Sequence, residues 1–539
     1  LETETSLPNF RQGDAIILYE RNRDTDNVTN KMVFKGNIEY LTENEIGIRL
    51  RATQQNPSVL PAESLYAIEH DTMDTTFRSM YQGLYIYLSA RKERRDLLLS
   101  QRPPRFDESL DSMISRSEDD FTRIALKAKA AQDYFLLIGP PGTGKTSCAL
   151  KKMVETFHAD KDAQILLLSY TNRAVDEICK SLASIAPAVD FIRVGSELSC
   201  DEAYRGHLIE NELSSCNRRS EVYERIRNCR IIVGTVAAIS GKPELFRLKH
   251  FDVAIIDEAT QILEPQLLGI LCARGEDGKD AIDKFVLIGD HKQLPAVVQQ
   301  NTEQSAIYDE SLLSIGLTNL KDSLFERLYR NCTATVHRSY DMLCRQGRMH
   351  PEVALFANRA FYGGRLIPVG LPHQIESSDT ICRLAFYPSV PEKAGASAKI
   401  NYSEARIVAD LAVRIYEDHQ TDFDESRTLG IITPYRSQIA LIKKEIESLG
   451  IPALNRILVD TVERFQGSER DVIIYSFCVN YPYQLKFLSN LTEEEGVLID
   501  RKLNVALTRA RKQMFITGVP ELLERNPLYK SLLKLIESF

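Results

Sequence analysis

Residues 136–150 read LLIGPPGTGKTSCAL, an apolar run followed by a glycine-rich turn and then by residues that favour a helix. The turn satisfies the pattern G-x-x-x-x-G-K-[ST] through Gly139, Gly144, Lys145 and Thr146. In this pattern, backbone N–H groups surround the phosphates of a nucleoside triphosphate, and the following helix directs its positive end at them. The stretch therefore predicts a strand, a phosphate loop and a helix, with Lys145 neutralising phosphate charge and Thr146 placed to coordinate Mg²⁺.

Length and composition indicate a globular protein of several domains. The chain has 539 residues, which is too long for one hydrophobic core, so three or four domains are expected. Its 43% hydrophobic and 26% charged residues are ordinary for a soluble protein, and no apolar run approaches the roughly 20 residues that span a bilayer. No secretory signal opens the chain, and the first residue is Leu1, not Met. We expect an intracellular location, in cytoplasm or nucleus, and a processed chain or an excised piece of a longer one.

The net charge and the cysteine content limit how the chain could bind a nucleic acid or a metal. The formal net charge is −8, so a nucleic acid would have to bind in a local basic groove and not through an overall positive field. The ten cysteines contain no C-x-x-C pair, which argues against a zinc or iron–sulfur framework and favours free thiols in a reducing compartment.

The first 118 residues predict two accessory parts. Helical apolar spacing between Asp74 and Leu99 predicts a helical stalk, assigned to residues 71–118. Three β-rich runs predict a small antiparallel barrel in residues 1–70, namely Asp14–Tyr19, Met32–Leu41 and Ile46–Arg51.

From Asp119 onward, strand-like runs alternate with helical ones. Such β-α alternation predicts an α/β fold of doubly wound parallel sheets with helices on both faces. Two series of runs indicate two lobes, which we assign to residues 119–334 and 335–539. The first series comprises Tyr134–Ile138, Gln164–Tyr170, Arg230–Val233, Asp252–Ile256 and Phe285–Ile288, and the second Thr428–Thr433, Asp471–Phe477 and Gln513–Thr517.

Two polar features leave their roles open. Residues 196–228 are charged and helical in spacing, which indicates an insertion in the first lobe that is either a nucleic-acid-contacting or regulatory element or a solvated helical hairpin. A basic cluster near the stalk either contacts a nucleic-acid backbone or forms a solvated helix face; it consists of Arg91, Lys92, Arg94, Arg95, Arg102 and Arg105.

Carboxylates and an amide follow two further apolar strands. Asp257 and Glu258 end one strand, and Gln293 lies in the segment GDHKQLP, residues 289–295, after the next. Phosphoryl transfer needs a metal ligand and a group that orients the attacking water. Asp257 suits the Mg²⁺ role, Glu258 suits the base, and Gln293 can hydrogen-bond both the γ-phosphate and the water. This third element favours a motor over other classes of phosphate-loop protein.

Six motifs occur in an order that resembles one family. They are Gly139–Thr146, Asp257–Ala259, Gly289–Pro295, Arg348–Pro351 (RMHP), Glu463–Glu469 (ERFQGSE) and Val505–Arg511 (VALTRAR). The series resembles superfamily 1 helicases of the nonsense-mediated-decay type, including the nuclease–helicase of Okazaki-fragment processing. The resemblance implies two RecA-like lobes with an ATP site between them and 5′→3′ translocation on single strands. The predicted barrel and stalk match the accessory parts of that family.

The resemblance also implies roles for individual residues. Arg348 and Arg509, from the second lobe, would stabilise transition-state charge beside Lys145, Glu258 and Gln293 when the lobes close. Nucleotide contacts would come from Gly139, Pro140, Pro141, Gly142, Thr143, Gly144, Lys145, Thr146, Gln466, Gly467 and Glu469, with Thr146 and Asp257 at the metal. Contacts to the nucleic-acid strand would come from Thr171, Asn172, Thr235, Thr433, Pro434, Tyr435 and Thr461.

The chain departs from the family pattern in two places. In the family, the stretch Q-Y-R-M-H-P contains a tyrosine that stacks on adenine; in this chain Gly347 takes the place of that tyrosine. Thr122 takes the place of the glutamine that reads adenine in the family. Strict selectivity for ATP is therefore in doubt. Tyr340 or Arg345 could replace the stack. The segment 478–500 is also longer than expected and carries three aromatic residues that either stack on bases or anchor a loop: Tyr481, Tyr483 and Phe487.

Two main functions compete at this point. The leading hypothesis is an ATP- and Mg²⁺-dependent helicase or translocase on single-stranded nucleic acid, with DNA favoured over RNA because the stalk, with its RRDLLL stretch, is most similar to the nuclease-linked branch. The alternative is a nucleic-acid-gated NTPase switch or ribonucleoprotein remodeller that separates no strands. A third class, a degenerate structural homologue, is disfavoured because the motif residues are present. By the same resemblance we expect a nuclease domain ahead of this chain in a longer protein.

Overall fold

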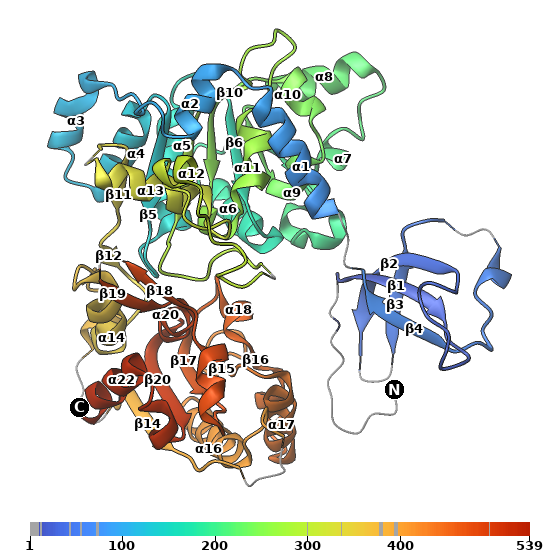
Figure 1. The fold of residues 1–539 in the computed structure, drawn as a ribbon, viewed down its shortest axis with the longest axis vertical. Helices are drawn as coiled ribbons and strands as arrows, with labels where there is room; N and C mark the ends of the chain where they lie inside the picture. Colours follow the sequence, from blue (N-terminus) through green and yellow to red (C-terminus); the bar gives the residue numbers. More distant parts are fainter. Residues whose placement is uncertain are drawn as a thin grey trace.

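The computed structural model describes residues 10, 13–42, 45–53, 56–71, 75–298, 300–335, 337–376, 381–392, 397–494 and 496–538. Figure 1 shows three bodies: a small sheet at one side and two α/β lobes, one above the other. Among the helices of the described chain, none combines the length and the hydropathy needed to cross a lipid bilayer.

The small sheet comprises four strands in the order β3-β2-β1-β4, and its neighbours are antiparallel. Three of them match the predicted runs, and the fourth, a short strand, was not predicted. No pairing joins β3 to β4 within the described residues, so a closed barrel is not confirmed. The strands are β1 (Ala15–Glu20), β2 (Val33–Leu41), β3 (Ile46–Leu50) and β4 (Tyr66–His70).

The helical stretch predicted between Asp74 and Leu99 forms two helices, α1 (Thr75–Leu88) and α2 (Lys92–Leu98), and the rest of the predicted stalk adds a third, α3 (Asp111–Arg116). Helix α1 packs closely on α11 (Glu264–Leu271) of the first lobe, because a Cβ at Gly83 would lie 2.3 Å from the carbonyl oxygen of Pro265. The stalk is therefore attached to the first lobe, as Figure 1 shows.

The first lobe is built on a seven-stranded parallel sheet in the order β11-β5-β10-β9-β6-β8-β7. In register, Gly289 lies opposite Ile138, and Leu287 lies opposite Ile256, so the carboxyl ends of three central strands meet at one edge. The strands are β5 (Tyr134–Ile138), β6 (Ile165–Ser169), β7 (Phe191–Val194), β8 (Ile231–Thr235), β9 (Phe251–Ile256), β10 (Ile282–Gly289) and β11 (Tyr340–Met342).

Helices cover both faces of this sheet, as the alternation predicted. One face packs on α4 (Asp120–Ala130), α5 (Lys151–His158) and α6 (Asn172–Ala183). The other packs on α9 (Val236–Ser240), α11 and α13 (Leu324–Ala334).

Two details of the first lobe differ from or refine the prediction. Strand β11 pairs with β5 in parallel, so this sheet takes a strand from beyond residue 335, and the predicted lobe boundary is too early. A three-residue strand at a sheet edge gives too little periodicity to be recognised. The insertion at 196–228 is helical, as predicted, and includes α7 (Ile209–Glu212) and α8 (Arg219–Asn228). Both helices pack against the apolar core of the lobe through residues such as Ile226.

The second lobe has a five-stranded parallel sheet in the order β14-β20-β17-β15-β16. Helices α14 (Pro351–Tyr362), α20 (Arg501–Leu507) and α22 (Pro527–Glu537) pack on one face, and α16 (Tyr402–Asp418) and α17 (Arg436–Ser448) pack on the other. The strands are β14 (Leu384–Pro388), β15 (Leu429–Ile432), β16 (Leu458–Asp460), β17 (Arg470–Ser476) and β20 (Ala510–Gly518).

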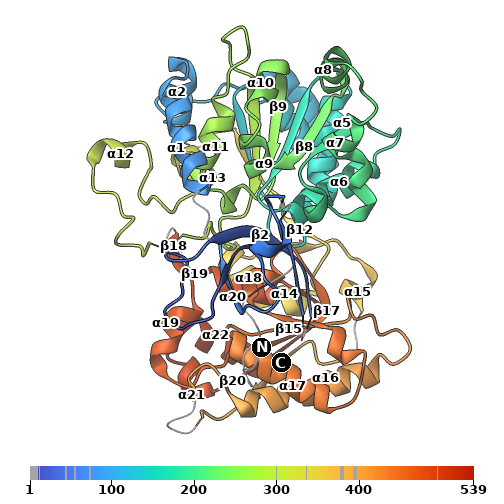
Figure 2. The same cartoon turned by 90° about the vertical axis from the view of Figure 1, so that its right-hand side faces the viewer.

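An antiparallel hairpin, β18 (Leu491–Glu494) and β19 (Val497–Asp500), extends from the second lobe towards the first. Both views place it near the junction of the lobes (Figures 1 and 2). It belongs to the long segment 478–500 that the sequence singled out.

Candidate nucleotide site between the two lobes

A cavity of about 620 Å³ lies between the lobes and is lined by both of them. It brings together nearly all the residues predicted to bind nucleotide or act in catalysis. These are Pro140, Pro141, Gly142, Thr143, Gly144, Lys145, Thr146, Asp257, Glu258, Gln293, Arg348, Gln466, Gly467, Glu469 and Arg509.

The phosphate loop has the backbone that its glycines predict. Gly142 and Gly144 adopt positive φ angles of 74° and 76°, which other residues rarely tolerate. Gly139 does not line the cavity but fastens the loop, because its N–H donates to the carbonyl oxygen of Gly289 at 2.9 Å. A helical segment begins at Lys145, so unpaired N–H groups at its start face the position of the phosphates.

Two adjacent carboxylates face the loop from the end of β9. The Thr146 hydroxyl donates to Asp257 at 2.5 Å. Asp257 is 1% exposed; this burial and the neighbouring Glu258 raise its pKa to about 6. Burial disfavours the charged form of this carboxylate, and a bound cation would stabilise it. A carboxylate and a hydroxyl together supply the oxygen ligands that Mg²⁺ prefers. The residues present therefore fit the predicted metal.

Glu258 lies beside the carboxylate of Asp257 but takes different partners. Lys145 Nζ lies 3.6 Å from one oxygen of Glu258, and Gln261 Nε2 donates to the other at 3.0 Å. Glu258 has a φ of +53°, in the left-handed region. Such a conformation in a residue with a side chain is often retained at functional sites.

Gln293 connects the two lobes. Its amide donates to Asp290 at 2.8 Å, and its oxygen accepts from Arg509 of the second lobe at 3.4 Å. Asp290 also accepts from the hydroxyl of Tyr362 at 2.7 Å, and Asn504 donates to that hydroxyl at 2.8 Å. A continuous hydrogen-bond chain thus runs from the first lobe into the second.

The two arginines of the second lobe are held by their own lobe. Arg509 is 2% exposed and donates to the carbonyl oxygens of Val505 and Ser468, at 3.0 and 3.3 Å. Burial and nearby Arg348 lower its pKa to about 9, so it is a cation at neutral pH. Arg348 Nε lies 2.5 Å from Glu469. Burial opposes the charge of Glu469, but Arg348 lowers its pKa below the usual value.

The residues predicted to contact a nucleic-acid strand lie at strand ends, mostly outside the cavity. Thr171 follows β6, Thr235 is the last residue of β8, and both cap the next helices through their hydroxyls. Thr171 also lines the nucleotide cavity. Thr433 is fully buried, and its hydroxyl has no hydrogen-bond partner among the described residues. The remaining predicted residues are not buried: Asn172, Pro434, Tyr435 and Thr461.

The two departures from the family pattern are visible in the site. Gly347 lines the cavity and, as a glycine, offers no aromatic ring to stack on a base. A Cβ added at this position would lie 3.2 Å from the side chain of Leu371, which is a tight contact. Thr122 donates to Asp119 at 2.6 Å at the start of α4, away from the cavity lining. Neither Tyr340 nor Arg345 is among the described residues that line the cavity, so neither supplies a stack in this conformation.

Sequence reasoning missed several residues of the site. Asp290 was within a quoted motif, but its position as the partner of Gln293 was not recognised. Gln261, three residues after Glu258, could have been found from its place in the same turn. Tyr362 and Asn504 join the network only through folding, since 142 positions separate them in the chain.

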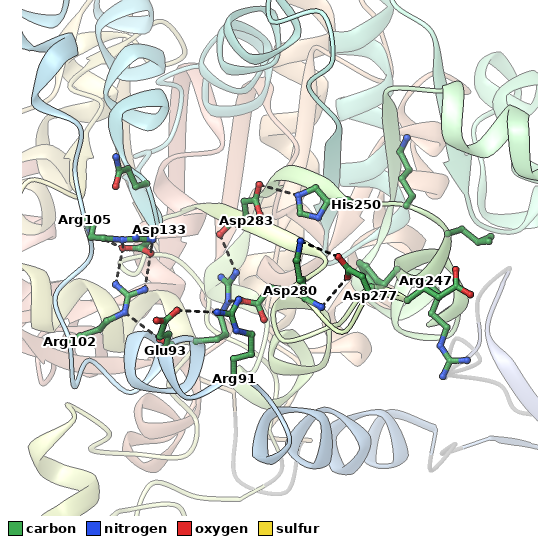
Figure 3. Close-up of a pocket in the computed structure, with 18 residues that line it drawn as sticks. Arg91, Glu93, Arg102, Arg105, Asp133, Arg247, His250, Asp277, Asp280 and Asp283 are labelled. Atoms are coloured by element: carbon green, nitrogen blue, oxygen red, sulfur yellow. Dashed lines mark hydrogen bonds and ion pairs between the residues drawn. The ribbon is translucent and has the colours of Figure 1, made fainter.

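The basic cluster near the stalk is largely structural. It borders a second cavity of about 760 Å³ at the amino end of the first sheet (Figure 3). Arg102 and Arg105 both donate to Asp133, and despite burial they hold the pKa of that carboxyl well below its usual range. Arg94 is 5% exposed and donates to the carbonyl oxygens of Ile282 and Asp283. These three arginines therefore hold the stalk to the lobe and are not free to contact a strand.

The fold and this cleft define a phosphate-loop NTPase with two RecA-like lobes. Two protein families, each described as an AAA domain, match the chain, one over residues 116–222 and 209–301 and the other over residues 320–521. The DNA replication ATP-dependent helicase/nuclease DNA2 of Bos taurus is 27% identical over 99% of this chain and 50% of that protein. The corresponding JHS1 protein of Arabidopsis thaliana is 28% identical over 98% of this chain and 38% of that protein.

These matches support a superfamily 1 helicase of the branch of the Okazaki-fragment nuclease–helicases. It spans half or less of the length of the two helicase/nucleases. Among solved structures, a complex of the Arterivirus nonstructural protein 10 helicase with DNA is 16% identical, with a TM-score of 0.37, over 76% of this chain and 65% of that one.

Proposed function

We propose that this chain is the motor of an ATP-dependent DNA helicase that moves 5′→3′ on single strands. The observation that carries the proposal is the cleft itself, where Arg509 of one lobe contacts Gln293 of the other beside two carboxylates and the phosphate loop. The names of the relatives support DNA as the nucleic acid.

At the nucleotide, each group has one task. Lys145 neutralises phosphate charge, and Thr146 and Asp257 hold Mg²⁺, which when bound supplies charge neutralisation to the phosphate oxygens. Glu258 orients the attacking water and accepts its proton, and Gln261 fixes the carboxylate for this task. Gln466, Gly467 and Glu469, which line the same cavity, are proposed to sense the γ-phosphate and the ribose.

Lobe closure couples this chemistry to motion. Arg509 and Arg348 reach the transferred phosphate only when the second lobe lies against the first. Loss of the γ-phosphate removes their shared ligand, so the lobes separate. Strand contacts on both lobes then change their spacing in each cycle. For this role we propose Thr171, Asn172 and Thr235 on the first lobe, and Pro434, Tyr435 and Thr461 on the second.

The domain assignment follows from the same scheme. We assign the small sheet to residues 1–70, the stalk to residues 71–118, the first lobe to the chain from residue 119 through β11, and the second lobe to the remainder.

ATPase assays with single-stranded DNA, single-stranded RNA and no nucleic acid test the proposal directly. We expect DNA to stimulate turnover most and Lys145→Ala to abolish it. Turnover that no nucleic acid stimulates would contradict the proposal. A strand-displacement assay on duplexes with a 5′ or a 3′ tail then tests direction, and hydrolysis without displacement would favour the alternative, a nucleic-acid-gated switch or RNA remodeller.

The choice of nucleotide is a separate proposal. Because no ring stacks at Gly347 and Thr122 caps a helix, we propose that the site accepts other nucleotides, with kcat/KM for GTP within roughly tenfold of that for ATP. Rejection of GTP by more than about a hundredfold would show that another group reads the base.

We propose that the nuclease named in the relatives does not operate in the cleft described above. The chain should therefore leave labelled single-stranded and flapped DNA intact in Mg²⁺ or Mn²⁺. Cleavage that persists in the Lys145→Ala variant would overturn this expectation.

A further inference from the structure

Three aromatic side chains gather on the second lobe, outside the nucleotide cavity. Tyr481 and Tyr483 lie with their ring centroids 5.8 Å apart and their planes 14° from parallel. Tyr483 is 54% exposed and Phe487, four residues later, is 68% exposed. We call Tyr481, Tyr483 and Phe487 the aromatic platform. Sequence alone left open whether these rings anchor a loop or face a ligand.

Other residues anchor the loop, which leaves the rings free. Leu485 and Leu488 are buried in the core of the second lobe. Gln484 is 2% exposed; it accepts from the N–H groups of Asn480 and Tyr481, both at 2.9 Å, and donates to the carbonyl oxygen of Ala398 at 2.7 Å. The exposed rings of Tyr483 and Phe487 thus sit on a segment that is fixed from beneath. A fixed ring loses little conformational entropy when it stacks on a ligand.

Three cations lie within the platform segment or next in sequence to the residues that Gln484 contacts. Lys486 lies between the two exposed rings in sequence, and Lys399 follows Ala398, to which Gln484 is bonded. Both lysines are exposed, as is Arg436 next to Tyr435. Within the described chain no acceptor pairs with these three side chains. The nearby carboxylate of Glu392 accepts from the N–H of Tyr402. Exposed rings together with unpaired cations fit a ligand made of bases and phosphates better than they fit an apolar protein ligand.

The platform is continuous with the proposed path of the strand. The Tyr435 hydroxyl accepts from Gln484 at 3.1 Å, so the residue that follows the proposed contact at Pro434 touches the platform segment. A strand that contacts Tyr435 would therefore lie beside the segment that carries the platform.

We propose that the aromatic platform stacks on bases of the single-stranded DNA, with Lys399, Lys486 and Arg436 at its phosphates. The proposal rests on the function proposed above and adds a base-contacting surface to it. Stacking on exposed rings is tolerant of sequence, since every base has a π face. The platform would hold the strand without selecting its sequence.

Oligonucleotides that differ only in their bases test this proposal. The full chain is titrated into a labelled thymidine oligonucleotide and into an abasic oligonucleotide of the same length and charge, at one salt concentration, with anisotropy as the signal. The wild-type chain should bind the thymidine strand more tightly. The double variant Tyr483→Ala/Phe487→Ala should lose roughly 10- to 100-fold for the thymidine strand and almost nothing for the abasic strand.

Matched variants complete the experiment. Tyr483→Phe keeps the ring and should bind as the wild type does, whereas Lys486→Ala should weaken both oligonucleotides alike. Tyr308→Ala, at a ring that is 81% exposed on the first lobe, should change neither. The unstimulated ATPase rate and the melting temperature of each variant show that the fold is kept.

The outcomes separate the platform from the motor. Unchanged binding of the double variant, or an equal loss for both oligonucleotides, would overturn the platform even if the wild-type chain binds DNA and hydrolyses ATP. Failure of the wild-type chain to bind either oligonucleotide would instead overturn the proposed function on which the platform rests.

Discussion

The two halves of the nucleotide cleft are built differently. On the first lobe, the loop and the carboxylates already contact one another, with 2.5 Å between Thr146 and Asp257 and 3.6 Å between Lys145 and Glu258. On the second lobe, the arginines are held by carbonyl oxygens and by Glu469, and Arg509 reaches Gln293 at 3.4 Å. A bond that long is weak. The comparison indicates that the first lobe is preorganised to bind nucleotide, whereas the charged groups of the second lobe are held mainly by partners on their own lobe.

The largest expected effect comes from the second half of the cleft. Arg509→Ala should reduce turnover by roughly 10³-fold or more, because an arginine that reaches the transferred phosphate stabilises charge formed in the transition state. Nucleotide affinity should change far less, since the binding groups lie on the other lobe. Single-turnover hydrolysis and equilibrium nucleotide binding measure the two quantities. The control is Arg525→Ala, at an exposed arginine of the same lobe. Equal losses of binding and turnover in Arg509→Ala would show that Arg509 also binds the ground state, contrary to the difference drawn between the two halves.

Glu258→Gln tests the first half. The variant should bind ATP normally and lose roughly 10²–10⁴-fold in turnover, because an amide cannot accept the proton of the attacking water. Glu177 lines the same cavity, and Glu177→Gln provides a comparison of equal charge change. Near-normal turnover of the Glu258 variant would remove that residue from the role of base.

A smaller effect is expected from the hairpin that joins the halves. Glu494 of β18 accepts from His291 at 3.0 Å and lies 3.6 Å from Lys292, close in sequence to Gln293. Burial opposes its charge, but the hydrogen bond with His291 and the charge of Lys292 lower its pKa to about 2, so it is ionised at neutral pH. Glu494→Gln should slow DNA-stimulated turnover roughly tenfold, equivalent to about 1.4 kcal/mol.

The control for this variant is Glu493→Gln, at the exposed neighbour on the same strand. If both substitutions have the same effect, net charge on the hairpin matters and the contact with His291 does not.

The smallest effect concerns stability and not turnover. Glu404 is fully buried and accepts from Ser476 at 2.7 Å and from the N–H of Cys478 at 2.8 Å, and burial raises its pKa to about 7. Because this value lies above that of an unfolded glutamate, the associated stability is present below about pH 4.5 and is lost as pH rises through 7. The loss amounts to at most about 3 kcal/mol.

Thermal unfolding at pH 5 and pH 8 measures this loss. Glu404→Gln should gain stability relative to the wild type at the higher pH, whereas Glu447→Gln, at an exposed site, should not. Asp257 in the first lobe is the contrasting case, since it has a lysine and a predicted metal to share its charge. Parallel pH profiles for wild type and Glu404→Gln would contradict the assignment.

The features that could be predicted from the sequence are those encoded by consecutive residues. The phosphate loop, the carboxylates after β9 and the central strands of both lobes are each encoded in a few consecutive residues. Short edge strands were missed. In β7 the apolar run is interrupted by Arg193, which is buried because it pairs with Asp176. One charged residue in a strand of only four residues removes the apolar pattern by which a buried strand is recognised.

Contacts that form only on folding could not be predicted. Tyr362, Asn504 and the pair of His291 with Glu494 depend on how the lobes lie against each other, and no local spacing encodes that. The same reason applies to Arg102 and Arg105, for which the sequence left a nucleic-acid contact and a solvated helix face both open, and which in the structure pair with Asp133.

The glycine contact between α1 and α11 sets which parts of the molecule move together. With no side chain at Gly83, and with Gly269 facing it, the stalk lies too close to the first lobe to slide without steric clash. The stalk and the first lobe are therefore expected to move as one body. When ATP turnover moves the second lobe, the stalk is expected to keep its place on the first lobe, so that the movement takes place between the two lobes and not between the stalk and its lobe.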